Sequence, residues 1–248
     1  RVHPQHKGLG IGSWLLGWAE RRASTAVALA PADARVVMRS FILSQDQSGA
    51  QLFVDSGFQL IRHSLRMVID LQDSVTEPDW PEGIKVRPMI RNVDEHAIVH
   101  AVRDSFQDHW GYVDQPFEDE FRDWMHFIEH DPDFDPSLWF LAMDGGEIAG
   151  ISLCYPKSSD NPEMGWVGTL GVRRAWRRNG LGLALLQHSF KEFHQRGKRQ
   201  VGLGVDAQNL TGALRLYTRA GMRSDPNYQH NVFEKELRPG MDFSKQAL

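Results

Sequence analysis

The stretch that decides the fold is Leu170-Gly171-Val172-Arg173-Arg174-Ala175-Trp176-Arg177-Arg178-Asn179-Gly180-Leu181-Gly182-Leu183. It reads as an apolar strand, then a cationic loop with glycines, then the start of a helix. Backbone N–H groups at a helix N-terminus bind phosphate, and glycine lets an anion approach the backbone closely. The arginines of the loop, Arg173, Arg174, Arg177 and Arg178, add positive charge. The stretch therefore predicts a diphosphate-binding site.

The better-known phosphate-binding patterns do not fit this loop. After Gly180 and Gly182, the dinucleotide pattern G-x-G-x-x-G needs a glycine where Leu185 stands. No Gly-Lys-Ser/Thr follows, so a P-loop is excluded as well. The spacing Arg-x-x-Gly-x-Gly between strand and helix resembles the acetyl-CoA motif of the GNAT family of N-acetyltransferases. The later run from Asn209 to Met222 looks like the second CoA motif of that family.

Composition restricts the class of protein. The chain has 248 residues, a formal net charge of −4, 41% hydrophobic and 24% charged residues, which is typical of a globular protein. The acidic balance argues against wholesale binding to nucleic acid. No apolar run approaches the length of a membrane span. Cys154 is the only cysteine, so we expect no internal disulfide, no metal site rich in cysteine, and a cytoplasmic location.

The chain contains an internal repeat. Residues 2–12 align with 172–182, and residues 50–58 align with 214–222. In the second copy, about 90 residues precede the glycine loop, whereas in the first copy the loop comes at residue 8. We therefore expect one complete unit and the C-terminal half of another, with a poorly satisfied sheet edge in the first. The predicted ranges are a half unit at 1–71, a linker at 72–83, a complete unit at 84–240 and a tail at 241–248.

Periodicity predicts an α/β fold for the second copy, with a mixed central sheet flanked by helices. In the helix expected over 92–106, Val93, Ile98, Val99 and Val102 are predicted to face inward. The other expected elements are strands 84–88, 138–143, 148–155, 166–172, 201–205 and 231–237 and helices 117–130, 181–193 and 211–219. This order matches the GNAT fold, and the doubled arrangement resembles the mycothiol synthase subgroup of the family.

The resemblance implies a role for each matching residue. The backbone amides of Leu170 and Val172, on either side of Gly171, would hold the pantetheine arm and polarise the thioester carbonyl. Tyr217 would protonate the departing thiolate, whereas Phe53 stands at the equivalent position of the first copy and has no hydroxyl. The remaining residues expected to bind acetyl-CoA are Arg177, Arg178, Asn179, Gly180, Leu181, Gly182, Leu183 and Asn209.

The general base is left open by the sequence. The subgroup has a glutamate on the strand where this chain has Trp166, and tryptophan cannot accept a proton. Glu163 at the entrance of the strand and Asp206 after the next strand are alternatives, and a water relay is equally compatible.

The acceptor is expected to be an amine of a small molecule or a peptide. His109, Trp110 and Tyr112, together with Trp166, are candidates for lining its pocket. Between Asp114 and Asp135 there are nine acidic residues and one arginine, Arg122, which would suit a cationic acceptor or form a solvated helix face.

Two other functions remain open. One is a regulatory module that binds CoA without catalysis. The other is a zinc metallopeptidase, because His126, Glu129 and His130 spell H-x-x-E-H. Against the second, Asp131-Pro132 ends the helix at once, and we expect no metal. The predicted activity is acetyl transfer from acetyl-CoA to a primary amine, with the oligomeric state open.

Overall fold

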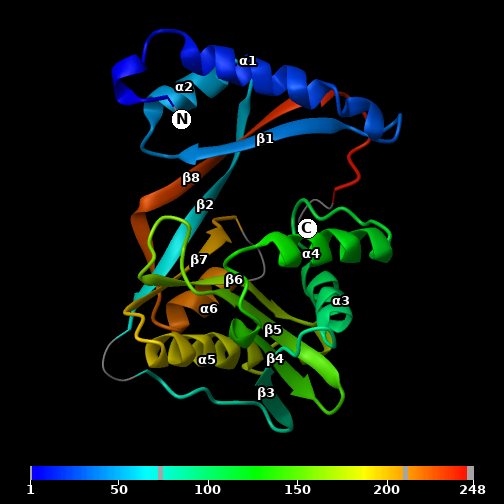
Figure 1. Ribbon diagram of the computed structural model, residues 1–248, viewed down its shortest axis with the longest axis vertical. Coiled ribbons are helices and arrows are strands. Elements are labelled where there is room, and N and C mark those ends of the chain that lie inside the picture. The colour runs from blue at the N-terminus through cyan, green and yellow to red at the C-terminus, as the bar shows by residue number, and fades with distance from the viewer. Residues whose placement is uncertain (1, 72–74, 209–211, 245–248) are drawn as a thin grey trace. The chain divides into compact units, whose positions relative to one another are not determined.

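The computed structural model describes residues 2–71, 75–208 and 212–244 (Figure 1). The chain divides into two compact units. Unit 1 holds the described residues of 1–65, 206–208 and 225–243, and unit 2 holds those of 66–205, 209–224 and 244–248. This division differs from the ranges 1–71 and 84–240 drawn from the repeat, because residues 225–243 cluster with the beginning of the chain.

The secondary structure follows an α/β pattern, as the periodicity predicts. The strands are β1 (Val36–Leu43), β2 (Gln59–Asp70), β3 (Ile84–Pro88), β4 (Trp139–Asp144), β5 (Glu147–Tyr155), β6 (Met164–Val172), β7 (Gln200–Asp206) and β8 (Arg223–Arg238). The helices are α1 (Ile11–Ser24), α2 (Gln47–Asp55), α3 (Glu95–Phe106), α4 (Phe117–His130), α5 (Leu181–Gln195) and α6 (Ala213–Arg219).

The strands form an eight-stranded mixed sheet in the order β1-β8-β2-β7-β6-β5-β4-β3. β6 and β7 are parallel, whereas the β3–β4, β4–β5, β5–β6 and β1–β8 pairs are antiparallel. The last strand, β8, is longer than the expected 231–237. It lies between β1 and β2, and β1 is left at the edge of the sheet, as expected for the first copy.

The sequence repeat is visible as a repeat of elements. With the offsets of the sequence alignment, α1 corresponds to α5, β1 to β7, α2 to α6 and β2 to the start of β8. Under this correspondence the order β1-β8-β2-β7 is symmetric, since the second strand of each copy lies beside the first strand of the other. This exchange explains why the end of the chain belongs to unit 1.

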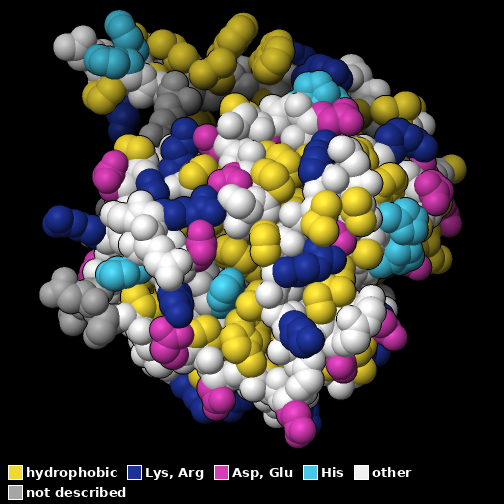
Figure 2. Space-filling model, turned by 60° about the horizontal axis from the view of Figure 1, so that its bottom comes forward, with side chains coloured by type: hydrophobic (Ala, Val, Ile, Leu, Met, Phe, Trp, Pro, Cys, Tyr) yellow, Lys and Arg dark blue, Asp and Glu magenta, His cyan; other side chains and the backbone are white. Residues whose placement is uncertain are grey.

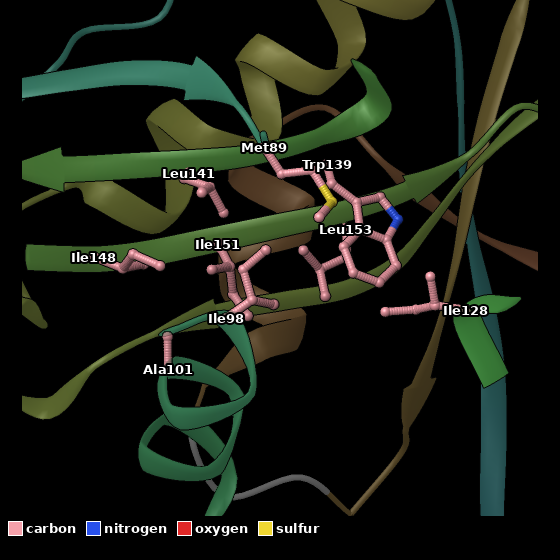
Figure 3. Packing of buried hydrophobic residues seen from close by; sticks show 9 residues of the cluster. All are labelled: Met89, Ile98, Ala101, Ile128, Trp139, Leu141, Ile148, Ile151 and Leu153. Atoms are coloured by element: carbon pink, nitrogen blue, oxygen red, sulfur yellow. The ribbon is translucent and has the colours of Figure 1, made fainter. Parts of the chain in front are cut away.

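Helices cover both faces of β5 and β6 in unit 2. A Cβ on Gly150 would stand 2.9 Å from Leu185 of α5, whereas a Cβ on Gly171, on the other face, would stand 2.9 Å from Ser105 of α3. The core between α3, α4 and the sheet contains nine buried hydrophobic residues (Figure 3): Met89, Ile98, Ala101, Ile128, Trp139, Leu141, Ile148, Ile151 and Leu153. Burial of each large side chain stabilises the unit by about 1.5–3 kcal/mol.

The structure corrects one prediction about the helices and confirms others. Val93 is 68% exposed, not inward, because α3 begins only at Glu95 and a turn precedes it. Ile98 and Val99 are buried as predicted. α4 ends at His130, before Asp131-Pro132, as the restriction of the residue before a proline predicts.

Candidate functional site

The strands β6 and β7 separate within unit 2. Their parallel pairing runs from Met164↔Gln200 to Val167↔Leu203. In the pairing of β5 with β6, Val167 and Thr169 lie opposite consecutive residues of β5. Gly168, between them, is left out of the register and forms a β-bulge. Gly168 and Gly204 are both exposed at the point where the pairing ends. Beyond this point the two strands are no longer paired, which leaves an opening between their backbones.

The loop after β6 has the backbone of an anion-binding turn. Gly180 has a φ of 90° and is the N-cap of α5, and Arg178 has a φ of 68°, a left-handed conformation that is strained for a side chain other than glycine. The N–H groups of Leu183 and Ala184 bond the Gly180 carbonyl. The first N–H groups of a helix have no intrahelical partner and point at whatever lies beyond its N-terminus. Together with the opening between the strands, this loop fits a ligand with a diphosphate.

Three arginines of the loop form ion pairs with acids at the end of α3 and just beyond it. Arg173 pairs with Asp104 at 2.7 Å, and Arg174 and Arg177 both pair with Asp108. These ion pairs hold the pKa of the Asp108 carboxyl below its ordinary value, with Arg174 as the main cause. Since the acids stand at the end of α3 and just beyond it, the three arginines fasten the loop to that helix. Their positive charge is therefore largely neutralised.

Arg177 also bonds backbone carbonyls on both sides. Its Nε donates to the Val172 carbonyl at 3.0 Å, and its Nη2 donates to the Ser105 carbonyl at 2.9 Å. Arg178 is exposed. On the face drawn in Figure 2, acidic and basic side chains are interspersed, without one continuous basic patch.

Tyr217 lies on α6, next to the loop. Leu216, its neighbour in the sequence, has its Cδ2 3.4 Å from the place where a Cβ on Gly182 would stand, so α6 packs against the start of α5. The side chain of Tyr217 is buried, and burial raises the pKa of its phenol. The hydroxyl therefore stays protonated at neutral pH, as a proton donor requires. Asn209, the other residue expected in this motif, lies outside the described residues.

The first copy has the same backbone but different chemistry at this position. Gly8 and Gly10 have φ values of 80° and 74°, close to those of Arg178 and Gly180. Phe53 stands in place of Tyr217 and stacks on Phe233 with ring centroids 5.2 Å apart. The position is therefore part of an apolar cluster in unit 1.

The candidate bases are held in contrasting ways. Asp206 accepts from the Arg62 guanidinium at 2.5 Å and from the Gln208 N–H at 2.8 Å, so both carboxylate oxygens are engaged. Glu163 is exposed just before β6. Five residues separate it from the bulge at Gly168, which is about 16 Å along an extended strand.

Trp166 is part of a cluster that the sequence did not reveal. A Cβ on Gly202 would stand 2.9 Å from its ring, so the indole lies over β7. The Arg66 guanidinium lies 5.4 Å from the ring centroid and makes two hydrogen bonds to Asp160, at 2.8 and 2.9 Å. No local signal could have found this, because Arg66 belongs to the first repeat copy. Tyr155 lies beside it, with its ring against Gly168 and its phenol pKa raised to about 12, chiefly by burial.

Of the residues expected on the acceptor side, Trp166 lies on β6, and the other three, His109, Trp110 and Tyr112, lie in the segment between α3 and α4. The His109 ring is 4.7 Å from the Phe106 ring, and the Tyr112 hydroxyl is 3.4 Å from Asp114. Several acids between Asp114 and Asp135 are paired: Arg103 bonds Asp114 and Glu120, and Lys157 bonds Asp133. The acidic character of residues 114–135 is thus partly offset by cations from other elements.

The H-x-x-E-H stretch lies at the end of α4. The His126 and His130 rings are 4.2 Å apart, and His130 Nδ1 lies 2.7 Å from the carbonyl of His126. Over the described residues, no group of three His, Cys, Asp or Glu side chains is arranged to hold a metal ion. In the same part of the chain, no helix is long and apolar enough to cross a membrane.

The open pair of parallel strands, the glycine loop at the N-terminus of α5 and the buried Tyr217 all belong to unit 2. Residues 96–222 match the family described as the acetyltransferase (GNAT) family, and the chain belongs to that family. The fold is the GNAT fold, and the protein is an enzyme of the acyltransferase class.

Known proteins agree with this assignment. A mycothiol acetyltransferase of Thermobispora bispora is 30% identical over 224 residues, which cover 89% of this chain and 70% of the relative. The crystal structure of a GCN5-related N-acetyltransferase from Sphaerobacter thermophilus is 37% identical with a TM-score of 0.78, and the match covers 97% of this chain and 72% of that one. A tandem GNAT protein from the clavulanic acid biosynthesis pathway shares the fold, with a TM-score of 0.67 at 18% identity over 97% of this chain and 74% of that one.

Proposed function

We propose that the protein transfers an acetyl group from acetyl-CoA to a primary amine by direct attack within a ternary complex. The observation that carries the proposal is the opening between β6 and β7, in the same unit as the glycine loop at the N-terminus of α5 and the helix α6 that packs against it and bears the buried Tyr217. The pantetheine arm lies in the opening along Leu170, Gly171 and Val172. The diphosphate lies on the backbone of residues 177–183.

The chemistry is a simple displacement. The amine nitrogen attacks the thioester carbonyl carbon, whose developing oxyanion accepts hydrogen bonds from the amides of Leu170 and Val172. The carbon–sulfur bond then breaks, and the Tyr217 phenol gives its proton to the thiolate. The attacking nitrogen gives its proton to solvent. Both carboxylate oxygens of Asp206 are engaged by Arg62 and the Gln208 N–H, and Glu163 stands far along the strand.

Direct attack is favoured over an acetylated enzyme by the state of Cys154. This cysteine is fully buried between β5 and α5, and burial raises the pKa of its thiol to about 11. Its Sγ lies 3.5 Å from Ser152 Oγ, which in turn lies 2.8 Å from Ser189 Oγ. A thiol in this setting is protonated and out of reach of a substrate.

The acceptor is a primary amine of a small molecule or a peptide. The segment containing His109, Trp110 and Tyr112, together with Trp166, forms the proposed acceptor side. The acids of α4 next to this segment favour a cationic acceptor over an anionic one.

A kinetic experiment tests the proposal. The protein is incubated with acetyl-CoA and a panel of primary amines, and free CoA thiol and acetylated amine are quantified together. We expect equal amounts of both products and initial-rate lines that intersect when both substrates are varied. Parallel lines, or an acetylated protein in the mass spectrum that passes its acetyl group to the amine, would contradict direct attack.

A further inference from the structure

Two aromatic side chains lie at the opening between β6 and β7. Tyr155 and Trp166 are direct partners in the antiparallel pairing of β5 with β6, so their side chains lie on the same face of the sheet. A Cβ on Gly165, the residue before Trp166, would stand 2.5 Å from Phe193 of α5. Because side chains alternate along a strand, the two aromatic rings lie on the face away from α5. The transfer step proposed for this site uses neither ring.

Glycines allow both rings to lie directly against the strands. A Cβ on Gly168, at the bulge, would stand 2.5 Å from Tyr155 Cε2, and a Cβ on Gly202 of β7 would stand 2.9 Å from the Trp166 ring. Real Cβ atoms essentially never come so close to another atom, so both positions need glycine while the rings stay in place. The Tyr155 hydroxyl is two bonds from Cε2. It therefore also lies at the bulge, where β6 and β7 stop pairing.

The indole of Trp166 is held by a cation whose charge is neutralised. The Arg66 guanidinium lies 5.4 Å from the ring centroid, and its side chain is only 10% exposed. It donates to both carboxylate oxygens of Asp160, and the Ser158 hydroxyl donates to the same carboxylate at 3.0 Å. Because the two charges offset each other, the pair adds no net charge beside the rings. The two rings therefore form an apolar, aromatic surface at the opening.

This surface has polar groups without a partner. Both rings are half-buried. In the part of the chain that the structure describes, neither the Tyr155 hydroxyl nor the Trp166 indole N–H makes a hydrogen bond. Burial, together with the nearby Asp131 and Cys154, raises the pKa of the Tyr155 phenol to about 12, so the hydroxyl keeps its proton at neutral pH. A half-buried hydroxyl of this kind gains when a ligand supplies the missing hydrogen bond.

We propose that Tyr155 and Trp166 bind the acceptor, and that the acceptor is a primary amine carried by an aromatic group. The aromatic group packs against the two rings, since aromatic rings favour offset or edge-to-face contacts with one another. The Tyr155 hydroxyl accepts a hydrogen bond from the neutral amine and so turns the nitrogen lone pair toward the thioester carbonyl. Tyr155 keeps its own proton, so the bonds made and broken in the transfer step are unchanged. This inference rests on the proposed function and names the class of acceptor for it.

Initial rates with two acceptors test the inference. Phenethylamine carries an aromatic ring on an aminoethyl chain, whereas ethanolamine carries a hydroxyl on the same chain. At saturating acetyl-CoA, we expect kcat/KM of the wild type to be about tenfold higher for phenethylamine. Tyr155→Phe keeps the ring and removes the hydroxyl, so it should lower kcat/KM for phenethylamine by about tenfold. Its affinity for acetyl-CoA, measured by calorimetry, should be unchanged.

A second variant and a matched control separate binding from folding. Trp166→Leu replaces the flat ring by another apolar side chain and should remove most of the preference for phenethylamine over ethanolamine. Tyr228→Phe makes the same change as Tyr155→Phe, but on β8 in unit 1, and should leave kcat/KM for both acceptors unchanged. Circular dichroism of each variant checks that the fold is kept.

The outcomes distinguish this inference from the proposed function. If the wild type acetylates amines but does not prefer phenethylamine, or if Tyr155→Phe has wild-type kinetics, the acceptor assignment is overturned while acetyl transfer stands. The same holds if Tyr155→Phe weakens acetyl-CoA binding as much as it lowers kcat/KM, because the ring would then act through the fold. If no amine is acetylated by the wild type, the proposed function fails and this inference fails with it.

Discussion

The helices α1 and α5 are copies of each other, yet they lie in opposite environments. Both follow a glycine in the left-handed conformation, with a φ of 74° at Gly10 and 90° at Gly180. No residue of α1 is buried, whereas Leu181, Leu185 and Phe193 of α5 are fully enclosed. The turn and the start of the helix are therefore encoded locally. What the helix buries depends on the strands packed against it.

The same contrast applies to chemistry. Both copies have the turn that would accept a diphosphate, but Tyr217 is matched by Phe53. The first copy therefore repeats the backbone of the turn and has an apolar ring where the second copy has a phenol. Substitutions at matched residues of the two copies test this difference between them.

The largest expected effect comes from the matched leucines of the two helices. Leu185 is 0% exposed, and Leu15, at the equivalent position of α1, is 40% exposed. Leu185→Ala should lower the free energy of unfolding of unit 2 by about 2–5 kcal/mol, because it removes packed methyl groups and leaves a cavity. Leu15→Ala should change stability by no more than about 0.5 kcal/mol. Urea denaturation followed by circular dichroism measures both, and equal costs would show that α1 is packed as tightly as α5.

The next effect concerns the tyrosine and the phenylalanine. Tyr217→Phe should lower kcat by about 10²–10⁴-fold, since the thiolate then leaves without a proton donor. The affinity for acetyl-CoA should change little. Phe53→Tyr is the matched control in the first copy and should leave kcat unchanged. A Tyr217→Phe variant with full activity would remove the tyrosine from the mechanism.

A smaller effect is expected at alkaline pH. Burial raises the pKa of the Cys154 thiol from 9.0 to about 11, so the folded state favours the protonated form. Below pH 9 the thiol is protonated in both states, so this difference in pKa does not change the free energy of unfolding. As the pH rises from 9 toward 11, the thiol ionises only in the unfolded chain, and the free energy of unfolding falls. Urea titrations at pH 8 and pH 11 should show the loss, and Cys154→Ala should make it shallower. A variant with the same pH dependence as the wild type would assign the loss to other groups.

Much of the fold could be predicted because its signals are local. The glycine loop, the proline after α4 and the alternation of β3 lie within short windows, and the structure has elements at these places. The placement of β8 between β1 and β2 could not be predicted, since pairing between strands distant in sequence leaves no local pattern. The inward assignment of Val93 was wrong because a turn has no helical face.

The site shows the same division. The glycine loop was predicted from its local pattern, and the roles of the loop residues and Tyr217 came from the resemblance to the GNAT family. The neutralisation of Arg177 by Asp108 joins residues 69 apart, and the contact of Arg66 with Asp160 joins residues 94 apart. Contacts between residues so far apart in the sequence form only when the sheet has assembled. The count of four arginines in the loop therefore suggested more unpaired positive charge than the structure has.

The measurement that tests the central claim most directly is calorimetric binding of acetyl-CoA to the wild type, Gly182→Asp and Gly182→Asn. A Cβ at this position meets Leu216 at 3.4 Å and Val172 at 3.6 Å, which are ordinary contacts, so both variants should fold. An aspartate in the first turn stabilises a helix but repels a bound diphosphate. The account predicts at least about a tenfold loss of affinity for Gly182→Asp and a much smaller loss for its neutral isostere. Equal affinities for all three proteins, or no binding to the wild type, would contradict a donor site at the start of α5.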